Sequence, residues 1–382
     1  MKIGKWARLF LMAAPLLAGC NGFWDKTTTT TPGSSGGNFY VLNQKTSQIA
    51  AFSIVSGKVT ALSGSPYSLG GTIAYAIAIA PSGTYMYVST TAGIYLYNIA
   101  TDGTLTRGNG GSVIAADAAF TMQIDPSGNW LIEAVSGVAA LNAVPIVSST
   151  GLVKTGGTEQ TIALPAITVQ QLAISPANST NPYVFVALGA GGTAVVPFNT
   201  VNANPFGTVF RIATVSSLGG ANAVAVDPAN RLLYIAETAS VTGTQTGGIG
   251  VFTIGSSITE IAGSPYPTGG TGPSSILPLA DTVYVANKAV SGSSTGNITG
   301  FSITATGTTF SLTAINTIAS GIGTMGLAED NTKTYLLAVN PGGSPDLSTY
   351  NFDTTTTGKL VASVTAATGT DPVQAVAIAA AP

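Results

Sequence analysis

A unit of about 50 residues recurs along the chain, and this repeat constrains the fold more than any other feature. Each unit contains an apolar run, a turn that usually holds a proline, and a second apolar run. Intervals of 45 to 52 residues separate the seven turn positions, which are Pro81, Pro126, Pro176, Pro228, Leu279, Asp330 and Ala380. Units of this size, with about four short strands each, are typical of β-propeller blades, so seven units predict seven blades.

The residues between these turns favour an all-β fold. The apolar runs are short and rich in Val, Ile, Ala and Tyr, and Gly, Pro, Asn and Asp interrupt them. No stretch keeps a helical period through three turns. A mean hydropathy of +0.41 and a charged fraction of 7% argue against a disordered chain, which requires low hydrophobicity and high charge.

The two ends of the repeat region predict how the ring closes. Residues 39–43, 49–54 and 59–62 resemble three strands that lack an innermost partner, and residues 373–380 resemble an innermost strand without its outer three. Pairing the two ends completes one blade and protects the edges of the ring. We therefore expect a closed propeller over residues 39–382 rather than an open solenoid.

The amino terminus predicts a bacterial lipoprotein signal over residues 1–19. Three basic residues precede a short apolar run, and the segment ends in the sequence LAGC at Cys20, which resembles the lipobox of lipoproteins. The thiol of Cys20 is then the lipid attachment site. An ordinary secretory signal, in which Cys20 is incidental, is the alternative, whereas a membrane-spanning helix needs a longer apolar run.

The residues after the signal predict a location. Residues 20–38 are rich in Thr, Ser and Gly, which predicts a lipidated flexible tether. Asn21 follows the Cys where an Asp would favour retention in the inner membrane, so an outer-membrane location in the bacterial cell envelope is expected. The expected partners are the membrane, reached through the lipid anchor, and an envelope protein, a glycan or a small molecule.

Several kinds of chemistry are excluded by composition. The chain has no His and one Cys, so it has no Ser-His-Asp or Cys-His catalysis, no His-ligated metal and no intramolecular disulfide. A net charge of −2 argues against nucleic-acid binding, which normally requires a basic face. The sequence predicts no cofactor and no metal site.

Charged residues are so scarce that each one in the blades is conspicuous. Glu133 interrupts an apolar run, and Glu237 follows another. Both fall on predicted second strands, where they could line the central channel, paired with Arg211 or Arg231, and act as acid and base. The structural alternative is a strand-end Glu that faces solvent or bonds to a neighbouring blade. These four residues are the catalytic candidates.

Asp125 and Asp227 each stand before a proline, in the turn between two apolar runs. An Asp at the first position of a turn accepts hydrogen bonds from the backbone N–H groups that follow it. We therefore interpret both residues as turn formers.

The amino-acid sequence of the repeats resembles that of a known protein family. Residues 63–71 and 262–270 are near-identical copies around the sequence GSPY, and residues 227–231 and 284–287 read DPANR and YVAN. Together they resemble the lactonase-type seven-bladed propellers, which include propeller-type 6-phosphogluconolactonases and YVTN-repeat surface proteins. The resemblance covers residues 39–382.

The resemblance implies a seven-bladed propeller and, for the enzymes of the family, lactone hydrolysis by His, Arg and acidic side chains around the central channel. Because this chain has no His, no catalytic residue carries over. We expect a lipid-anchored, non-catalytic binding or scaffolding module. The alternative is a lactone hydrolase that uses carboxylate and Arg groups at the channel. A third possibility is an assembly factor for outer-membrane proteins. Propellers of that kind usually have eight blades and different repeat sequences.

Overall fold

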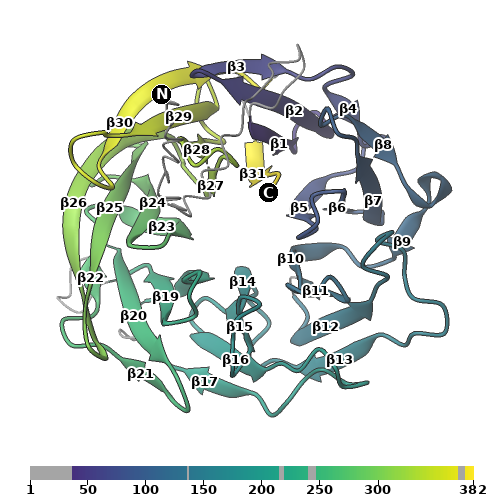
Figure 1. Cartoon of the computed structure of the whole chain (residues 1–382), viewed down its shortest axis with the longest axis horizontal. Coiled ribbons are helices and arrows are strands. Elements are labelled where there is room, and N and C mark those ends of the chain that lie inside the picture. Colours follow the sequence, from purple (N-terminus) through teal and green to yellow (C-terminus); the bar gives the residue numbers. More distant parts are fainter. Residues whose placement is uncertain (1–36, 136, 215–218, 240–246, 369–374) are drawn as a thin grey trace, which may run out of the picture. The chain divides into compact units, whose positions relative to one another are not determined.

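Seven antiparallel sheets surround a common axis in the computed structural model, which confirms the predicted all-β, seven-bladed β-propeller (Figure 1). The structure describes residues 37–135, 137–214, 219–239, 247–368 and 375–382. The predicted signal, Cys20 and nearly all of the tether lie outside the described residues. The blades are numbered below along the chain, and their strands are given from the axis outwards.

The ring begins with the blade that joins the two chain ends. Blade 1 consists of β31 (Ala375–Ala380), β1 (Gly37–Asn43), β2 (Gln48–Val55) and β3 (Lys58–Ala61), with the short β4 (Tyr67–Ser68) beside β2. Blade 2 consists of β5 (Ala74–Ile79), β6 (Tyr85–Thr90), β7 (Gly93–Ile99) and β8 (Leu105–Arg107), with β9 (Val113–Ala115) beside β7.

The next three blades carry all four catalytic candidates. Blade 3 consists of β10 (Ala119–Ile124), β11 (Trp130–Val135), β12 (Ala140–Pro145) and β13 (Gln160–Ala163). Blade 4 consists of β14 (Gln171–Ile174), β15 (Tyr183–Ala187), β16 (Thr193–Pro197) and β17 (Phe210–Ile212). Blade 5 consists of β18 (Ala221–Val226), β19 (Leu232–Glu237), β20 (Gly248–Ile254) and β21 (Ile258–Glu260), with β22 (Tyr266–Pro267) beside β20.

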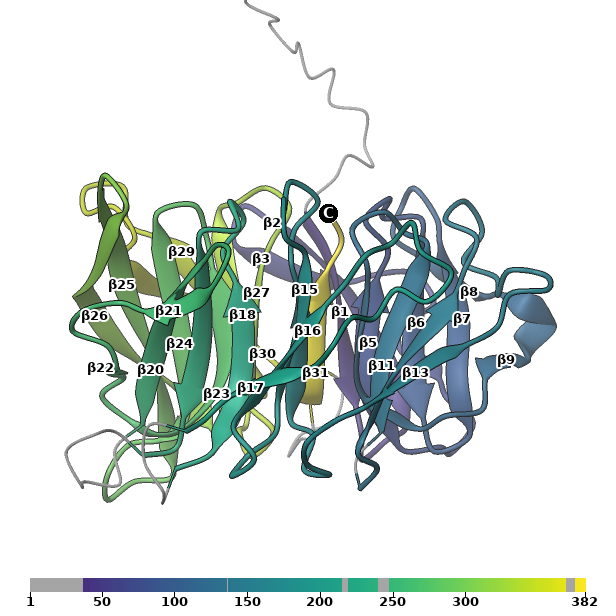
Figure 2. The ribbon, with the colours of Figure 1, turned by 90° about the horizontal axis from the view of Figure 1, so that it is seen from below.

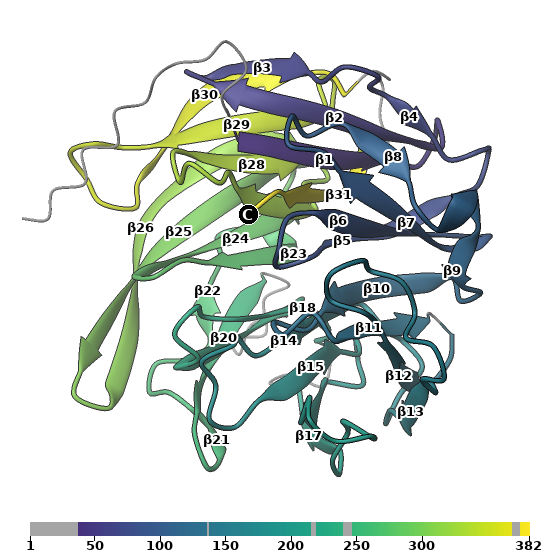
Figure 3. The same ribbon diagram turned by 45° about the vertical axis from the view of Figure 1, so that its right-hand side comes forward.

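The last two blades return the chain to its start. Blade 6 consists of β23 (Thr271–Pro278), β24 (Thr282–Ala289), β25 (Thr295–Thr306) and β26 (Thr309–Ile322). Blade 7 consists of β27 (Gly326–Glu329), β28 (Tyr335–Val339), β29 (Leu347–Phe352) and β30 (Leu360–Ala366). The hairpin formed by β25 and β26 extends beyond the rim of the ring (Figure 3).

The ring closes as the sequence predicts. β31 pairs antiparallel with β1, with Phe39 opposite Ala380 and Val41 opposite Ile378. β31 also contacts β27 and β5, the inner strands of the blades on either side. In the side view, β31 stands next to β1, and the blade strands run roughly along the axis (Figure 2). The predicted closing strand began at residue 373, and residues 373 and 374 lie outside the described residues.

In blades 3 and 5, the turn from the first to the second strand is built around a buried Asp, as predicted. Asp125 Oδ1 accepts hydrogen bonds from the backbone N–H groups of Asn129 (2.8 Å) and Trp130 (2.6 Å), and Oδ2 accepts one from Ser127 (2.9 Å). Asp227 holds the same turn in blade 5. These carboxylates accept hydrogen bonds from backbone N–H groups that would otherwise have no partner in the turn.

Apolar side chains fill the space between neighbouring blades, so the core is divided into clusters around the ring. Buried tyrosines also join the blades through their hydroxyl groups. Tyr87 of blade 2 donates to the carbonyl of Gly151 in blade 3, and Tyr284 of blade 6 donates to that of Gly358 in blade 7.

Helical structure is nearly absent from the described residues. Their one helical element is the three-residue 3₁₀ turn η1 (Asn109–Gly111), between β8 and β9. Accordingly, no helix in this part of the chain is long and apolar enough to cross a membrane.

Candidate functional site

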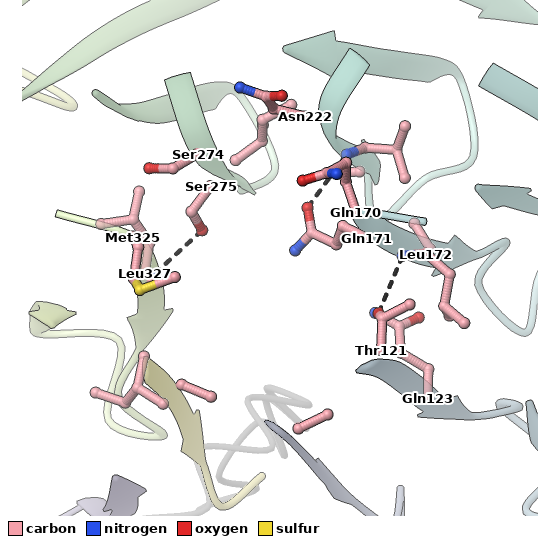
Figure 4. Close-up of a pocket in the computed structure, with 18 of the residues that line it drawn as sticks. Thr121, Gln123, Gln170, Gln171, Leu172, Asn222, Ser274, Ser275, Met325 and Leu327 are labelled. Atoms are coloured by element: carbon pink, nitrogen blue, oxygen red, sulfur yellow. Dashed lines mark hydrogen bonds between the residues drawn. The ribbon is translucent and has the colours of Figure 1, made fainter. Parts of the chain in front are cut away.

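A cavity of about 650 Å³ lies on the propeller axis, and all seven inner strands contribute to its wall. Figure 4 shows side chains of β10, β18, β23 and β27 around this space. A concave site lined by several independent elements is where small ligands usually bind.

The wall of the cavity is polar but almost without charge. Its polar side chains are mainly amides and hydroxyls: Gln44, Thr121, Gln123, Gln170, Gln171, Asn222, Ser274 and Ser275. Lys288, an exposed residue of β24, is the one charged side chain among the described residues that line it. No described Asp, Glu or Arg is part of the wall.

Two side-chain amides of the cavity wall, the channel amides Gln123 and Gln171, also form hydrogen bonds from one blade to the next. Gln123 Oε1 on β10 accepts a hydrogen bond of 3.1 Å from the backbone N–H of Ile174 on β14, and Gln171 Oε1 accepts one of 3.2 Å from Val224 on β18. Both bonds use the carbonyl end of the amide. Among the described residues, neither NH₂ group has a hydrogen-bond acceptor, so two donors remain in the wall of the cavity (Figure 4).

Glu133 and Glu237 lie on second strands, as the sequence predicts, but neither is part of the cavity wall. Glu133 on β11 faces Met122 on one side and Asn142 on the other in the strand register. Glu237 ends β19 two blades further around the ring. Both side chains are buried, with exposed fractions of 0% and 3%.

The two Arg candidates lie apart from both glutamates. Arg211 is an exposed residue of β17, the outermost strand of blade 4. Arg231 forms a 2.6 Å ion pair with Asp227 in its own turn and donates a 2.6 Å hydrogen bond to the carbonyl of Ala280 in blade 6. The structure therefore does not bring the four candidates together at the channel.

Glu133 has two carboxylate neighbours that the sequence analysis did not identify. One oxygen from each of Asp117, Glu133 and Glu159 lies within 4.8 Å of the other two. Burial, and then Asp117 beside it, raise the pKa of Glu133 to about 8. The Asn142 amide opposes this shift but lies outside hydrogen-bonding geometry. Burial and the nearby Asp117 also raise the pKa of Glu159.

The sequence contained a signal for this cluster. Asp117, Glu133 and Glu159 fall within one repeat unit, in a chain with only 15 acidic residues. Asp117 lies between β9 and β10, and Glu159 directly precedes β13, so neither interrupts an apolar run as Glu133 does. Their grouping depends on how the outer strands fold back, which the repeat pattern alone does not define.

The arrangement of blades and axial cavity places the chain among the seven-bladed propellers, and comparisons with known proteins agree. No family model matches the sequence, and no curated protein matches it. Solved structures that share the fold include 6-phosphogluconolactonase-like proteins.

Two of these structures illustrate the likeness. A Bacteroides fragilis protein, provisionally assigned as a 6-phosphogluconolactonase, has 14% sequence identity and a TM-score of 0.69, over 92% of this chain and 99% of the other. The Pseudomonas aeruginosa periplasmic gluconolactonase PpgL has 14% identity and a TM-score of 0.65, over 91% and 99%. At this level of identity the likeness shows the fold.

Proposed function

We propose that this chain is a ligand-binding propeller of the bacterial cell envelope, and that its axial cavity binds a small, hydroxyl-rich acid such as a sugar acid. The composition of the cavity wall carries the proposal. Amides and hydroxyls exchange hydrogen bonds with a polyol, and Lys288 supplies one positive charge for a carboxylate.

The position of the amides supports this choice. The NH₂ groups of Gln123 and Gln171 are donors on neighbouring inner strands, and their carbonyl ends are fixed by blade-to-blade bonds. Donors held in place in this way bind a ligand at a low entropic cost. The cavity volume of about 650 Å³ is within the range of small-molecule sites.

Lactone hydrolysis is the alternative, and the names of the structural neighbours favour it. Opening a lactone requires a base or a nucleophile close to the substrate. The described wall offers hydroxyls, amides and Lys288, but no carboxylate and no His. For this reason we rank binding above hydrolysis.

Titration calorimetry with the purified full chain tests the proposal. We expect gluconate to bind more tightly than glucose, and Lys288→Gln to weaken gluconate binding about three- to tenfold while leaving glucose binding unchanged. Lys58→Gln, on the outer strand β3, is the matched control and should bind like the wild type. Absence of gluconate binding, or equal losses in both variants, would contradict the proposal.

The same preparation distinguishes hydrolysis from binding. Gluconolactone opening is followed at several enzyme concentrations against the spontaneous rate. A rate no higher than the spontaneous one supports a binding protein. Enzyme-dependent hydrolysis would overturn this ranking, and its loss in Glu133→Gln or Glu237→Gln would identify the carboxylate responsible.

Membrane attachment through Cys20 is the second part of the proposal. It is supported by the basic residues, apolar run and LAGC sequence of the amino terminus. Cys20→Ala should abolish labelling by a radioactive fatty acid and release the protein from the membrane fraction. Labelling that persists in this variant would refute the assignment.

A further inference from the structure

A second feature, away from the axial cavity, also has the character of a binding site. Asp117 comes from the link between β9 and β10, Glu133 from the second strand of blade 3, and Glu159 from the residue before its outermost strand. Although they come from three separate segments, one oxygen of each lies within 4.8 Å of the other two. Among the described residues, no Lys or Arg forms an ion pair with any of the three.

Glu133 provides the observation that points to a ligand. Its side chain is fully buried, with an exposed fraction of 0%, and neither carboxylate oxygen has a hydrogen-bond partner in the described part of the chain. A buried carboxylate normally has donors or a positive charge around it, because burial without them is costly. Here the nearest charged groups are two further carboxylates, so a positive partner is missing from the protein itself.

We propose that Asp117, Glu133 and Glu159 form a binding site for a divalent cation, and that the cation is Ca²⁺. All three ligands are carboxylate oxygens, which suit hard cations such as Ca²⁺ and Mg²⁺ rather than soft metals. Water can complete the coordination shell. The proposal does not depend on what the axial cavity binds.

The origin of the ligands favours Ca²⁺ over Mg²⁺. The three carboxylates come from three separate segments of the chain. The variable coordination of Ca²⁺ tolerates such a set of ligands, while Mg²⁺ requires a near-ideal octahedron and usually keeps several waters.

A cation at this position would tie together segments that do not pair directly with one another. The link that carries Asp117 leads from blade 2 into blade 3, and Glu133 and Glu159 lie two strands apart within blade 3. Binding would therefore stabilise the outer part of blade 3 and its connection to blade 2. Because only the folded chain brings the ligands together, Ca²⁺ should raise the unfolding temperature.

Thermal unfolding of the full chain, stripped with EDTA and then titrated with CaCl₂, tests the proposal. We expect a saturable rise of several degrees, with half-saturation between about 0.1 and 1 mM, the range of weak extracellular calcium sites. Glu133→Gln and Asp117→Asn should bind Ca²⁺ at least tenfold more weakly. Asp281→Asn, which changes an exposed carboxylate in the turn between β23 and β24, should respond like the wild type.

Each variant is compared with itself, with and without Ca²⁺, so a change in its basal stability does not obscure the result. No rise in the wild type up to about 10 mM Ca²⁺, or an equal rise in Glu133→Gln, would overturn the proposal and leave protonation as the way Glu133 is neutralised. A larger rise with Mg²⁺ than with Ca²⁺ would overturn the choice of cation.

Luminescence of Tb³⁺, which takes the same oxygen ligands as Ca²⁺, gives a second readout that is independent of stability. Trp130 lies three residues before Glu133 on β11, a separation of about 10 Å along the strand, and can transfer excitation energy to a bound ion. Emission excited through tryptophan should rise on Tb³⁺ addition and fall again as Ca²⁺ displaces it. Emission of equal strength in Glu133→Gln would contradict the assigned ligands.

Discussion

Asp125 and Glu133 belong to the same blade, and both have an exposed fraction of 0%, yet their surroundings are opposite. The carboxylate of Asp125 accepts backbone hydrogen bonds from Ser127, Asn129 and Trp130. Glu133 has no hydrogen-bond donor among the described residues and has two carboxylates beside it. The two carboxylates are therefore equally buried, but only that of Asp125 has donors in the described part of the chain that stabilise its charge.

The two carboxylates therefore have different requirements: the charge of Asp125 is stabilised by the fold, whereas the charge of Glu133 requires a partner that the described residues do not supply. The turn after β10 provides all the donors that Asp125 needs, so its charge is stabilised by the chain itself. Glu133 must take up a proton or a cation to become comparably stable. Removing the charge should consequently have opposite effects at the two positions.

The largest expected effect is at Asp125. Asp125→Ala leaves three backbone N–H groups without their acceptor, and hydrogen bonds to charged groups contribute about 1.5–3 kcal/mol each, without full additivity. We expect a loss of about 3 kcal/mol in the free energy of unfolding, measured by urea denaturation. Asp281→Ala, at an exposed turn, is the control, and a loss below about 1 kcal/mol at Asp125 would remove the contrast with Glu133.

At Glu133 the corresponding change should stabilise the chain in the absence of divalent cations. Its pKa in the folded protein is about 8, compared with 4.5 as the ordinary value, so the folded state binds more protons than the unfolded state between these pH values. In EDTA, the free energy of unfolding should therefore fall as the pH rises from about 4.5 to 8.

Glu133→Gln should flatten this part of the pH profile. At pH 8 we expect the variant to be more stable than the wild type, by on the order of 2 kcal/mol, because its amide cannot ionise. Urea denaturation at pH 5 and pH 8 measures the effect. If the two proteins have parallel profiles, the carboxyl of Glu133 does not titrate in this range, and the contrast with Asp125 would be wrong.

The sequence was sufficient to predict the fold because the same local pattern recurs along the chain. The apolar runs recur at a spacing of about 50 residues, the Asp turn recurs in blades 3, 5 and 7, and the two chain ends supply complementary strands. The pairing of Val41 with Ile378 confirms the predicted closure. Strand number and ring closure follow from these local patterns together with the need to protect sheet edges.

The candidate sites were harder to predict because they depend on which parts of the blades meet. Glu133 stood out in an apolar run, but Asp117 and Glu159 come from connecting segments whose paths the repeat does not define. The channel amides Gln123 and Gln171 look like ordinary polar residues in a strand. Their importance comes from facing the axis, and the sequence does not show which side of an inner strand does so.

The smallest effect is expected for two buried tyrosine hydroxyls, one with a hydrogen-bond partner and one without. Tyr87 and Tyr234 are both fully buried on second strands, in blades 2 and 5. Tyr87 donates to the carbonyl of Gly151 in the next blade, whereas the hydroxyl of Tyr234 has no hydrogen-bond partner among the described residues. Tyr234 shares a core cluster with Phe301 of β25 and Leu312 of β26 in blade 6. The turn of the long β25–β26 hairpin lies beyond the rim of the ring (Figure 3).

Replacing each tyrosine by Phe measures the value of the blade-to-blade bond. Tyr87→Phe should lower the free energy of unfolding by about 1–2 kcal/mol, because it leaves the Gly151 carbonyl without its donor. Tyr234→Phe should change it by less than about 0.5 kcal/mol or raise it, since it removes a buried hydroxyl that has no partner. Urea denaturation of both variants at pH 7 makes the comparison. Equal losses would mean that the hydroxyl of Tyr234 finds a partner in solution, and that lack of a partner in the fold is not enough to distinguish the two kinds of buried polar group.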